Sequence, residues 1–213
     1  MNLPDLRQLS YDTRSARETG IALLIASSIL AFFLLIPASP APENLTSAAP
    51  NAFADIPLNA KAAIVYDLAT GETLYEKNAD AQLPLASLTK LLTVYAALAV
   101  LSPETQITIP ENATSVEGLR IFSAGQTFSL SDLARLTLTA SLNDGAVAIA
   151  SATAERESRS ESEMLAGAAA ALNLSQTYAV NGSGLDVSSV VSGGYGSARD
   201  LARLAGAIVE KAP

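Results

Sequence analysis

The sequence predicts a mixed α/β domain of the α+β type, in which short antiparallel strands come first and helices follow. Two β-rich runs, Lys61 to Asp67 and Glu72 to Lys77, flank Leu68-Ala69-Thr70-Gly71, a connection typical of a hairpin. A long apolar stretch from Leu85 to Leu101 then predicts a central, buried helix. Strands at the start followed mostly by helices do not fit regular βαβ winding.

The rest of the domain is divided by capping and turn residues. Ser129 or Ser131 is expected to cap a helix that runs through Leu138, and Ser197 to cap a last helix. We expect a break between two helices that begins at Ser141 and runs through Leu142 to Gly145. The remaining predicted segments are, in order, strand and loop over 104–121, a helix to about Ala154, a helix over 161–172, a turn at Asn181-Gly182-Ser183-Gly184, a Ser/Gly loop over 188–196 and a helix over 198–211.

An apolar segment precedes the domain and divides the chain into four regions. Residues 20–38 are uncharged and long enough to cross roughly 30 Å of hydrocarbon. Arg7, Arg14 and Arg17 precede this segment and favour a cytoplasmic N-terminus, so the domain would face outward. We therefore expect a cytoplasmic segment (1–19), a transmembrane signal anchor (20–38), a flexible linker (39–57) and a catalytic domain (58–213). A cleaved signal peptide is the alternative, but the small-x-small sequence at residues 52–54 lies far downstream.

Composition excludes several classes of function. The net charge of -8 and the lack of a basic stripe argue against nucleic-acid binding. The chain has no Cys and no His, which removes thiolate nucleophiles, the usual general base and the commonest metal ligands. A serine hydrolase built from this chain would need another base, and Lys is the leading substitute. The lysines are Lys61, Lys77, Lys90 and Lys211.

Ser87 and Lys90 form the first candidate catalytic pair. Residues three apart share a helix face, so the Ser87 hydroxyl and the Lys90 amine can meet. Burial at the head of an apolar helix would lower the pKa of Lys90 and allow it to take the Ser87 proton. Helix-terminal N–H groups near Ser87 would help to stabilise developing negative charge. The alternative is a capping serine followed by a solvated lysine.

Ser141-Leu142-Asn143 is the second candidate element. A hydroxyl and an amide two residues apart in a loop can project into one cleft. Ser141 could then relay a proton to a leaving group, and Asn143 could bind the substrate backbone. Ordinary helix capping is the alternative, because Ser and Asn are common at helix ends.

Four segments in order resemble the D-alanyl-D-alanine carboxypeptidases, the low-molecular-mass penicillin-binding proteins of peptidase family S11. The segment from Pro84 to Thr93 resembles their nucleophile segment, whose Ser-x-x-Lys signature is general to the superfamily. Leu138 to Ala146 resembles their Ser-Gly-Asn-Asp-Ala-Ala motif, with Leu142 in place of Gly and Gly145 in place of Ala. Asn181-Gly-Ser-Gly-Leu-Asp186 resembles an Asn-x-x-Gly-Leu-Asp turn, and Ser197-Ala-Arg-Asp-Leu-Ala202 a helix start.

The resemblance implies a penicillin-binding-protein or serine β-lactamase-like transpeptidase fold and a peptidoglycan peptidase. The implied catalytic residues are Ser87, Lys90 and Ser141, with Asn143 in substrate binding and no metal or organic cofactor. The implied partners are a pentapeptide stem ending in D-Ala-D-Ala, β-lactams as covalent inhibitors and the cytoplasmic membrane of a bacterium.

Two departures from the family pattern shape further expectations. Leu142 could narrow the cleft. The family's Lys-Thr-Gly does not occur in these 213 residues, which is the pattern expected of a truncated chain that lacks C-terminal strands. A serine β-lactamase and a non-catalytic, membrane-tethered relative are therefore the alternatives.

Overall fold

The computed structural model describes residues 56–211. The predicted signal anchor at 20–38, the segment before it and nearly all of the predicted linker lie outside the described residues. Within residues 56–211, none of the helices combines the length and the apolar character needed to cross a bilayer.

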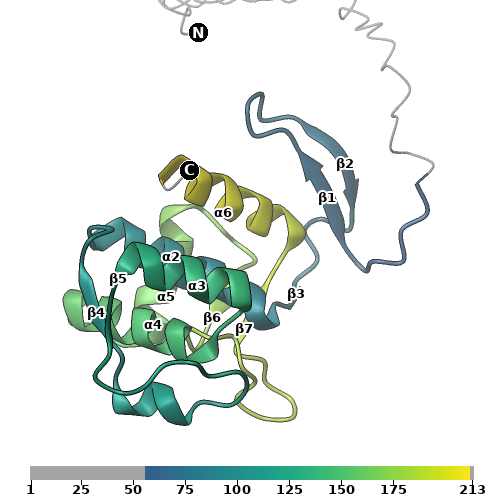
Figure 1. Cartoon of the computed structure of the whole chain (residues 1–213). Coiled ribbons are helices and arrows are strands. Elements are labelled where there is room, and N and C mark those ends of the chain that lie inside the picture. Colours follow the sequence, from purple (N-terminus) through teal and green to yellow (C-terminus); the bar gives the residue numbers. More distant parts are fainter. Residues whose placement is uncertain (1–55, 212–213) are drawn as a thin grey trace, which may run out of the picture. The chain divides into compact units, whose positions relative to one another are not determined.

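The strands form three small antiparallel sheets (Figure 1). The predicted hairpin is confirmed: β1 (Ala63–Tyr66) pairs with β2 (Thr73–Lys77), and Gly71 in the connection has a φ of 77°. A second pair consists of β4 (Gln106–Thr108) and β5 (Thr127–Ser129). The third sheet has the order β3 (Leu83–Pro84), β7 (Gly194–Gly196), β6 (Tyr178–Ala179), so it joins segments far apart in the sequence.

Residues 56–211 contain five α-helices and two short 3-10 helices. They are η1 (Ala86–Leu88), α2 (Thr89–Val100), η2 (Glu111–Ser115), α3 (Leu130–Ala140), α4 (Asn143–Glu157), α5 (Glu161–Ala171) and α6 (Ala198–Lys211). Ser129 caps α3 by accepting from the Asp132 N–H at 3.1 Å, and Ser197 accepts from the Asp200 N–H at 3.1 Å. Both capping predictions are therefore confirmed, with Ser129 rather than Ser131 as the first cap.

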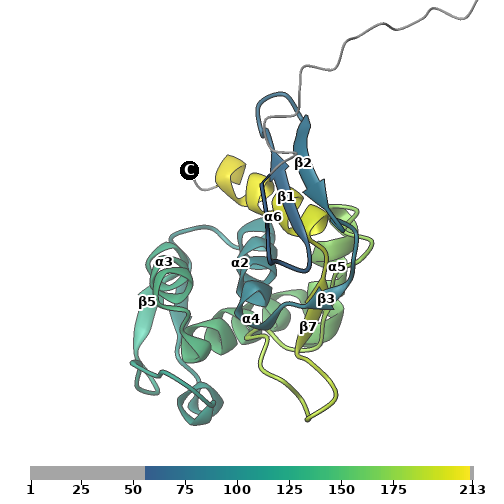
Figure 2. The same ribbon diagram turned by 90° about the vertical axis from the view of Figure 1, so that its right-hand side faces the viewer.

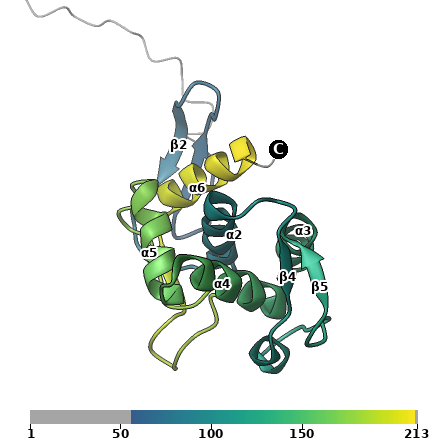
Figure 3. The same ribbon diagram turned by 90° about the vertical axis from the view of Figure 1, so that its left-hand side faces the viewer.

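Helix α2 lies at the centre of the domain and contacts α3, α4, α5 and α6 (Figure 3). Two buried apolar clusters meet on it. Val94 and Ala97 pack with α3, α4 and β4, whereas Leu92, Tyr95 and Ala96 pack with α5 and α6. A helix between two cores needs apolar residues on most of its faces, which explains why no polar stripe runs along α2.

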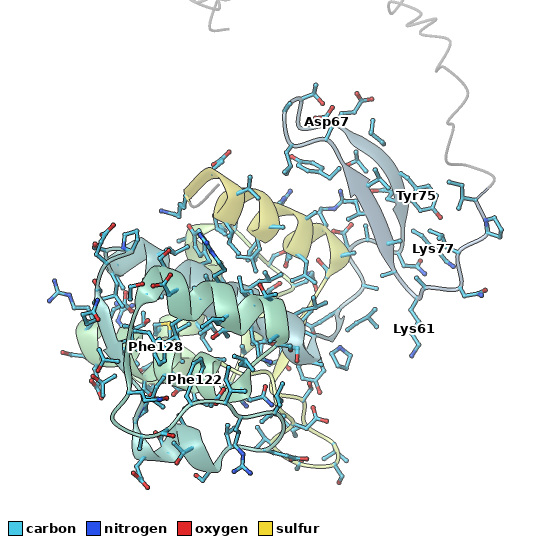
Figure 4. The ribbon with its side chains drawn as sticks, viewed as in Figure 1. Lys61, Asp67, Tyr75, Lys77, Phe122 and Phe128 are labelled. Carbon is cyan, nitrogen blue, oxygen red and sulfur yellow. The ribbon has the colours of Figure 1, made fainter. Side chains whose placement is uncertain are left out.

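The cluster between α3 and α4 includes an aromatic pair. The rings of Phe122 and Phe128 lie side by side, with centroids 4.9 Å apart (Figure 4). Phe122 follows η2 and Phe128 lies in β5, so the pair holds this loop region against the helices. The loop therefore has a fixed position next to the start of α4.

The hairpin is attached to α6, and the two lie next to each other in Figures 1 and 2. Arg199 of α6 donates to Glu76 at 2.5 Å and to Asp80 at 2.8 Å. The Arg199 guanidinium lowers the pKa of the Asp80 carboxyl.

Several segment boundaries differ from the sequence predictions. The helix predicted from Leu85 is divided into η1 and α2, which begins at Thr89, and α4 ends at Glu157 rather than at about Ala154. The break before α4 is shorter than 141–145, because Ser141 alone takes the left-handed conformation (φ 54°) and the helix begins at Asn143. The predicted loop over 188–196 ends in β7, because Gly194 and Tyr195 pair with β6 and β3. A three-residue strand rich in glycine gives no pattern from which pairing could be read.

Candidate active site

Ser87 and Lys90 lie where η1 meets the first turn of α2. Ser87 is exposed, whereas Lys90 is 1 % exposed, although it is a lysine. The Lys90 Nζ lies 2.9 Å from the Ser87 Oγ, which confirms that the two groups can meet. Burial lowers the pKa of Lys90, so a larger fraction of this amine is neutral at a given pH than in an exposed lysine.

The other three lysines are placed elsewhere. Lys61 and Lys77 lie at the hairpin (Figure 4), where the Lys77 amine donates to the Leu58 carbonyl at 2.6 Å. The Lys211 amine lies 5.7 Å from the centre of the Tyr95 ring. Lys90 is thus the lysine that contacts Ser87.

Lys90 has a second hydrogen-bond partner that sequence reasoning missed. Its Nζ donates to the backbone carbonyl of Ser183 at 3.1 Å. Ser183 belongs to the turn Asn181-Gly182-Ser183-Gly184, which the sequence marked as a turn without a role in the site. No sequence signal could have identified this acceptor, because every residue carries a backbone carbonyl.

The 181–185 turn packs directly on the chain that carries the nucleophile. Gly184 has a φ of 79°, and a Cβ on it would overlap the carbonyl oxygen of Ala86, the residue before Ser87. Ala86 itself has a φ of 46°, a conformation that costs an alanine roughly 1–2 kcal/mol. Two backbones meeting this closely fix the position of Ser87 relative to the turn.

A cleft of about 410 Å³ opens beside Ser87 and Lys90. Ser141, at the end of α3, lines the same cleft, so the structure brings three of the four predicted site residues together. The other lining residues are aliphatic, and they are Leu85, Ala86, Leu88, Leu91 and Leu138. The cleft therefore places one hydroxyl, one buried amine and a second hydroxyl within mainly apolar walls.

Asn143 is not among the residues that line this cleft. It is 8 % exposed, and its Nδ2 donates to the Glu117 carbonyl at 2.7 Å, which ties the loop at 117–118 to the start of α4. Its role in substrate binding stays a prediction.

The expectation that Leu142 narrows the cleft is wrong. Leu142 is fully buried in the cluster with Val94, Leu133 and Ile149, so its side chain fills the core. The left-handed Ser141 reverses the chain at the end of α3 and thereby directs the next side chain inward.

Asp144 supports this corner from inside the protein. It is fully buried, and its Oδ2 accepts from the Ile121 N–H at 2.8 Å and from the Phe122 N–H at 3.0 Å. Backbone N–H groups satisfy the carboxylate in place of a cation. Over residues 56–211, no cluster of three or more acidic side chains is suited to hold a metal ion.

The family model described as D-alanyl-D-alanine carboxypeptidase matches residues 46–213. The chain belongs to this family, peptidase family S11. A D-alanyl-D-alanine endopeptidase of Pseudomonas aeruginosa is 30% identical over 185 residues, which cover 83% of this chain and 56% of that protein.

Solved structures of family members share the fold. The D-alanyl-D-alanine carboxypeptidase DacD of Francisella tularensis matches with a TM-score of 0.64 at 30% identity, over 73% of this chain and 38% of that chain. Penicillin binding protein 6B of Escherichia coli matches with a TM-score of 0.61 at 29% identity, over 75% of this chain and 53% of that chain.

A ligand-bound structure is also similar. Penicillin-binding protein D2 of Listeria monocytogenes, in its cefotaxime-bound form, matches with a TM-score of 0.57 at 28% identity, over 75% of this chain and 65% of that chain. The S11 chain thus has the penicillin-binding-protein fold, with mixed helices and antiparallel strands, and it spans about half the length of the curated relative.

Proposed function

We propose that this S11 chain is a serine-type D-Ala-D-Ala carboxypeptidase that removes the terminal D-alanine from peptidoglycan stem peptides. The observation that carries the proposal is the 2.9 Å contact between the exposed Ser87 hydroxyl and the buried Lys90 amine. A nucleophile paired with a base of lowered pKa is the arrangement that acyl transfer requires. The family supplies the substrate class.

The proposed reaction has two steps. The neutral Lys90 amine takes the proton from Ser87 as Oγ attacks the carbonyl carbon of the penultimate D-Ala. The peptide bond then breaks, Ser141 relays a proton to the departing D-Ala amine, and an ester links the stem peptide to Ser87. Water hydrolyses this acyl-enzyme, and Asn143 is the residue proposed to bind substrate backbone.

A β-lactam is proposed to acylate Ser87 by the same route. Its ring amide takes the place of the scissile peptide bond, and ring opening leaves the acyl group on the serine. The cefotaxime-bound form of the similar Listeria protein supports this part of the proposal.

A second candidate is D-alanyl-D-alanine endopeptidase, the activity in the name of the Pseudomonas relative. The acyl half of the reaction is the same, and the leaving amine then belongs to a neighbouring stem peptide. Un-cross-linked pentapeptides and cross-linked stem dimers, offered separately, would distinguish the two activities.

The proposed location is the outer face of a bacterial cytoplasmic membrane, with a single membrane-spanning anchor at residues 20–38. The support is the sequence: an uncharged apolar run preceded by Arg7, Arg14 and Arg17. Protease treatment of intact and lysed spheroplasts would test the orientation. Digestion of the domain in intact spheroplasts is the expected result.

Labelling of the full-length chain with a fluorescent penicillin tests the chemistry. We expect one covalent adduct per chain, located on Ser87 by peptide mass spectrometry and lost in Ser87→Ala. Ser189→Ala is the matched control, because Ser189 is an exposed serine in the loop before β7. An adduct that survives Ser87→Ala, or no adduct in the unaltered chain, would refute the proposal.

The lifetime of the adduct separates the enzymatic alternatives. A carboxypeptidase holds the opened drug as a long-lived ester, whereas a β-lactamase releases it rapidly. Complete absence of a Ser87 adduct would instead favour a non-catalytic relative.

A further inference from the structure

A lysine acts as a general base only if its lone pair faces the proton that it takes. A neutral amine has two N–H donors and one lone pair. The Lys90 Nζ lies 2.9 Å from the Ser87 Oγ and 3.1 Å from the Ser183 carbonyl oxygen. When one N–H is donated to Ser183, rotation about the Cε–Nζ bond is restricted, and the lone pair can be directed at the Ser87 hydroxyl.

The direction of the Ser183 carbonyl is set by the side chain of Asn181. Its Oδ1 accepts from the Gly184 N–H at 2.8 Å and from the Ser183 hydroxyl at 3.0 Å. Its Nδ2 donates to the Leu185 carbonyl at 2.9 Å. One amide thus closes the turn with three hydrogen bonds, and the Gly184 N–H that it holds belongs to the same peptide unit as the Ser183 carbonyl.

The ends of the turn are fixed to α2 and η1 independently of Asn181. Thr93 on α2 donates its hydroxyl to the Gly182 carbonyl at 2.7 Å. Gly184 packs against the backbone of Ala86. Loss of the Asn181 amide would therefore leave the turn in place while freeing the peptide unit between these two anchors.

We propose that Asn181 is a positioning residue that acts on Lys90 through the Ser183 carbonyl. The proposal rests on the proposed function in one respect, namely that Lys90 is the base for Ser87. Asn181 makes no hydrogen bond to Ser87 and does not line the cleft, so its effect falls on the acylation step rather than on binding.

Acylation kinetics of the full chain in detergent micelles test the proposal. With a fluorescent penicillin, we expect Asn181→Ala to lower the maximal acylation rate about 10- to 100-fold, the range that follows from a misplaced catalytic group. The dissociation constant of the non-covalent complex should stay within about threefold, because preformed cleft walls bind the drug before acylation.

Thr153→Val is the matched control for lost stability. Thr153 is fully buried on α4, and its hydroxyl donates to the Ile149 carbonyl at 2.7 Å. We expect this variant to acylate at the unaltered rate. An equal fall in both variants, or an Asn181→Ala rate within about threefold of the unaltered chain, would overturn the proposal.

A second measurement does not depend on activity. Because the chain has only four lysines, 13Cε-lysine NMR can follow the titration of Lys90 directly. Loss of the Ser183 acceptor removes a hydrogen bond that favours the charged amine, so the pKa of Lys90 should fall further in Asn181→Ala. An unmoved pKa would overturn the proposal.

The two measurements separate the two claims. If penicillin does not label Ser87 in the unaltered chain, the proposed function fails, and the NMR titration still decides whether Asn181 acts on Lys90. If labelling occurs but Asn181→Ala changes neither the acylation rate nor the titration, only the role of Asn181 fails.

Discussion

The contact between Gly184 and Ala86 can be tested with a pair of glycine substitutions. Gly184 (φ 79°) and Gly125 (φ 81°) have almost the same positive φ, so Gly→Ala costs both positions about 1–2 kcal/mol of conformational energy. A Cβ on Gly125 meets nothing within 4 Å. A Cβ on Gly184 would overlap the Ala86 carbonyl oxygen and lie 2.8 Å from the Thr89 Oγ1.

The overlap adds roughly 1–3 kcal/mol to the cost at Gly184, the range for overpacking in a buried site. Urea unfolding should therefore show Gly184→Ala to be less stable than Gly125→Ala by that difference. Acylation of Ser87 by a fluorescent penicillin should slow at least about tenfold in Gly184→Ala and stay unchanged in Gly125→Ala. Equal losses of stability together with equal rates of labelling would refute the reasoning.

Four further substitutions test the packing and the electrostatics of the site. Gly145→Ala places a methyl group on the buried Thr137 hydroxyl and should cost about 1–2 kcal/mol of stability. Adding Thr137→Ala should recover the lost stability. Additive effects of the two substitutions in a double-mutant cycle measured by urea unfolding would contradict this. Leu142→Ala should cost about 2–4 kcal/mol by the same measurement, and a loss below about 1 kcal/mol would contradict the burial of Leu142. Lys90→Met should slow acylation at least about 100-fold. The unaltered chain should gain stability relative to Lys90→Met as pH rises from the lowered pKa of Lys90 toward 10.5. In that range the lysine binds more protons in the unfolded chain than in the folded one. A difference in unfolding free energy that does not change with pH would contradict this.

Much of the secondary structure could be predicted because its signals are local. The hairpin is marked by two β-rich runs around Gly71, and α3 by the Ser129 cap with Asp132 three residues later. The short strands β3, β6 and β7 could not be predicted. They have two or three residues each, and Pro84 pairs with Tyr195 more than a hundred residues later, so no periodic pattern marks them.

The features of the candidate site likewise fall into those that the local sequence predicts and those that it does not. The contact between Ser87 and Lys90 follows from helical spacing, and the burial of Lys90 follows from the apolar helix around it. The inward orientation of Leu142 depends on the left-handed Ser141, which the sequence does not reveal. Asn143 was expected in the cleft because an amide can bind peptide backbone, yet its Nδ2 donates to Glu117.

The use of a main-chain oxygen to hold Lys90 has a genetic consequence. A point mutation in the codon for Ser183 changes the side chain but cannot delete the carbonyl that accepts from Lys90. Because Ser183 is 3 % exposed and its hydroxyl donates to Asn181 Oδ1, only small replacements fit there, and Ser183→Ala should be tolerated more readily than Asn181→Ala or Gly184→Ala. Saturation mutagenesis selected for penicillin labelling should recover Ala and other small residues at position 183, and little besides the original residue at positions 181 and 184.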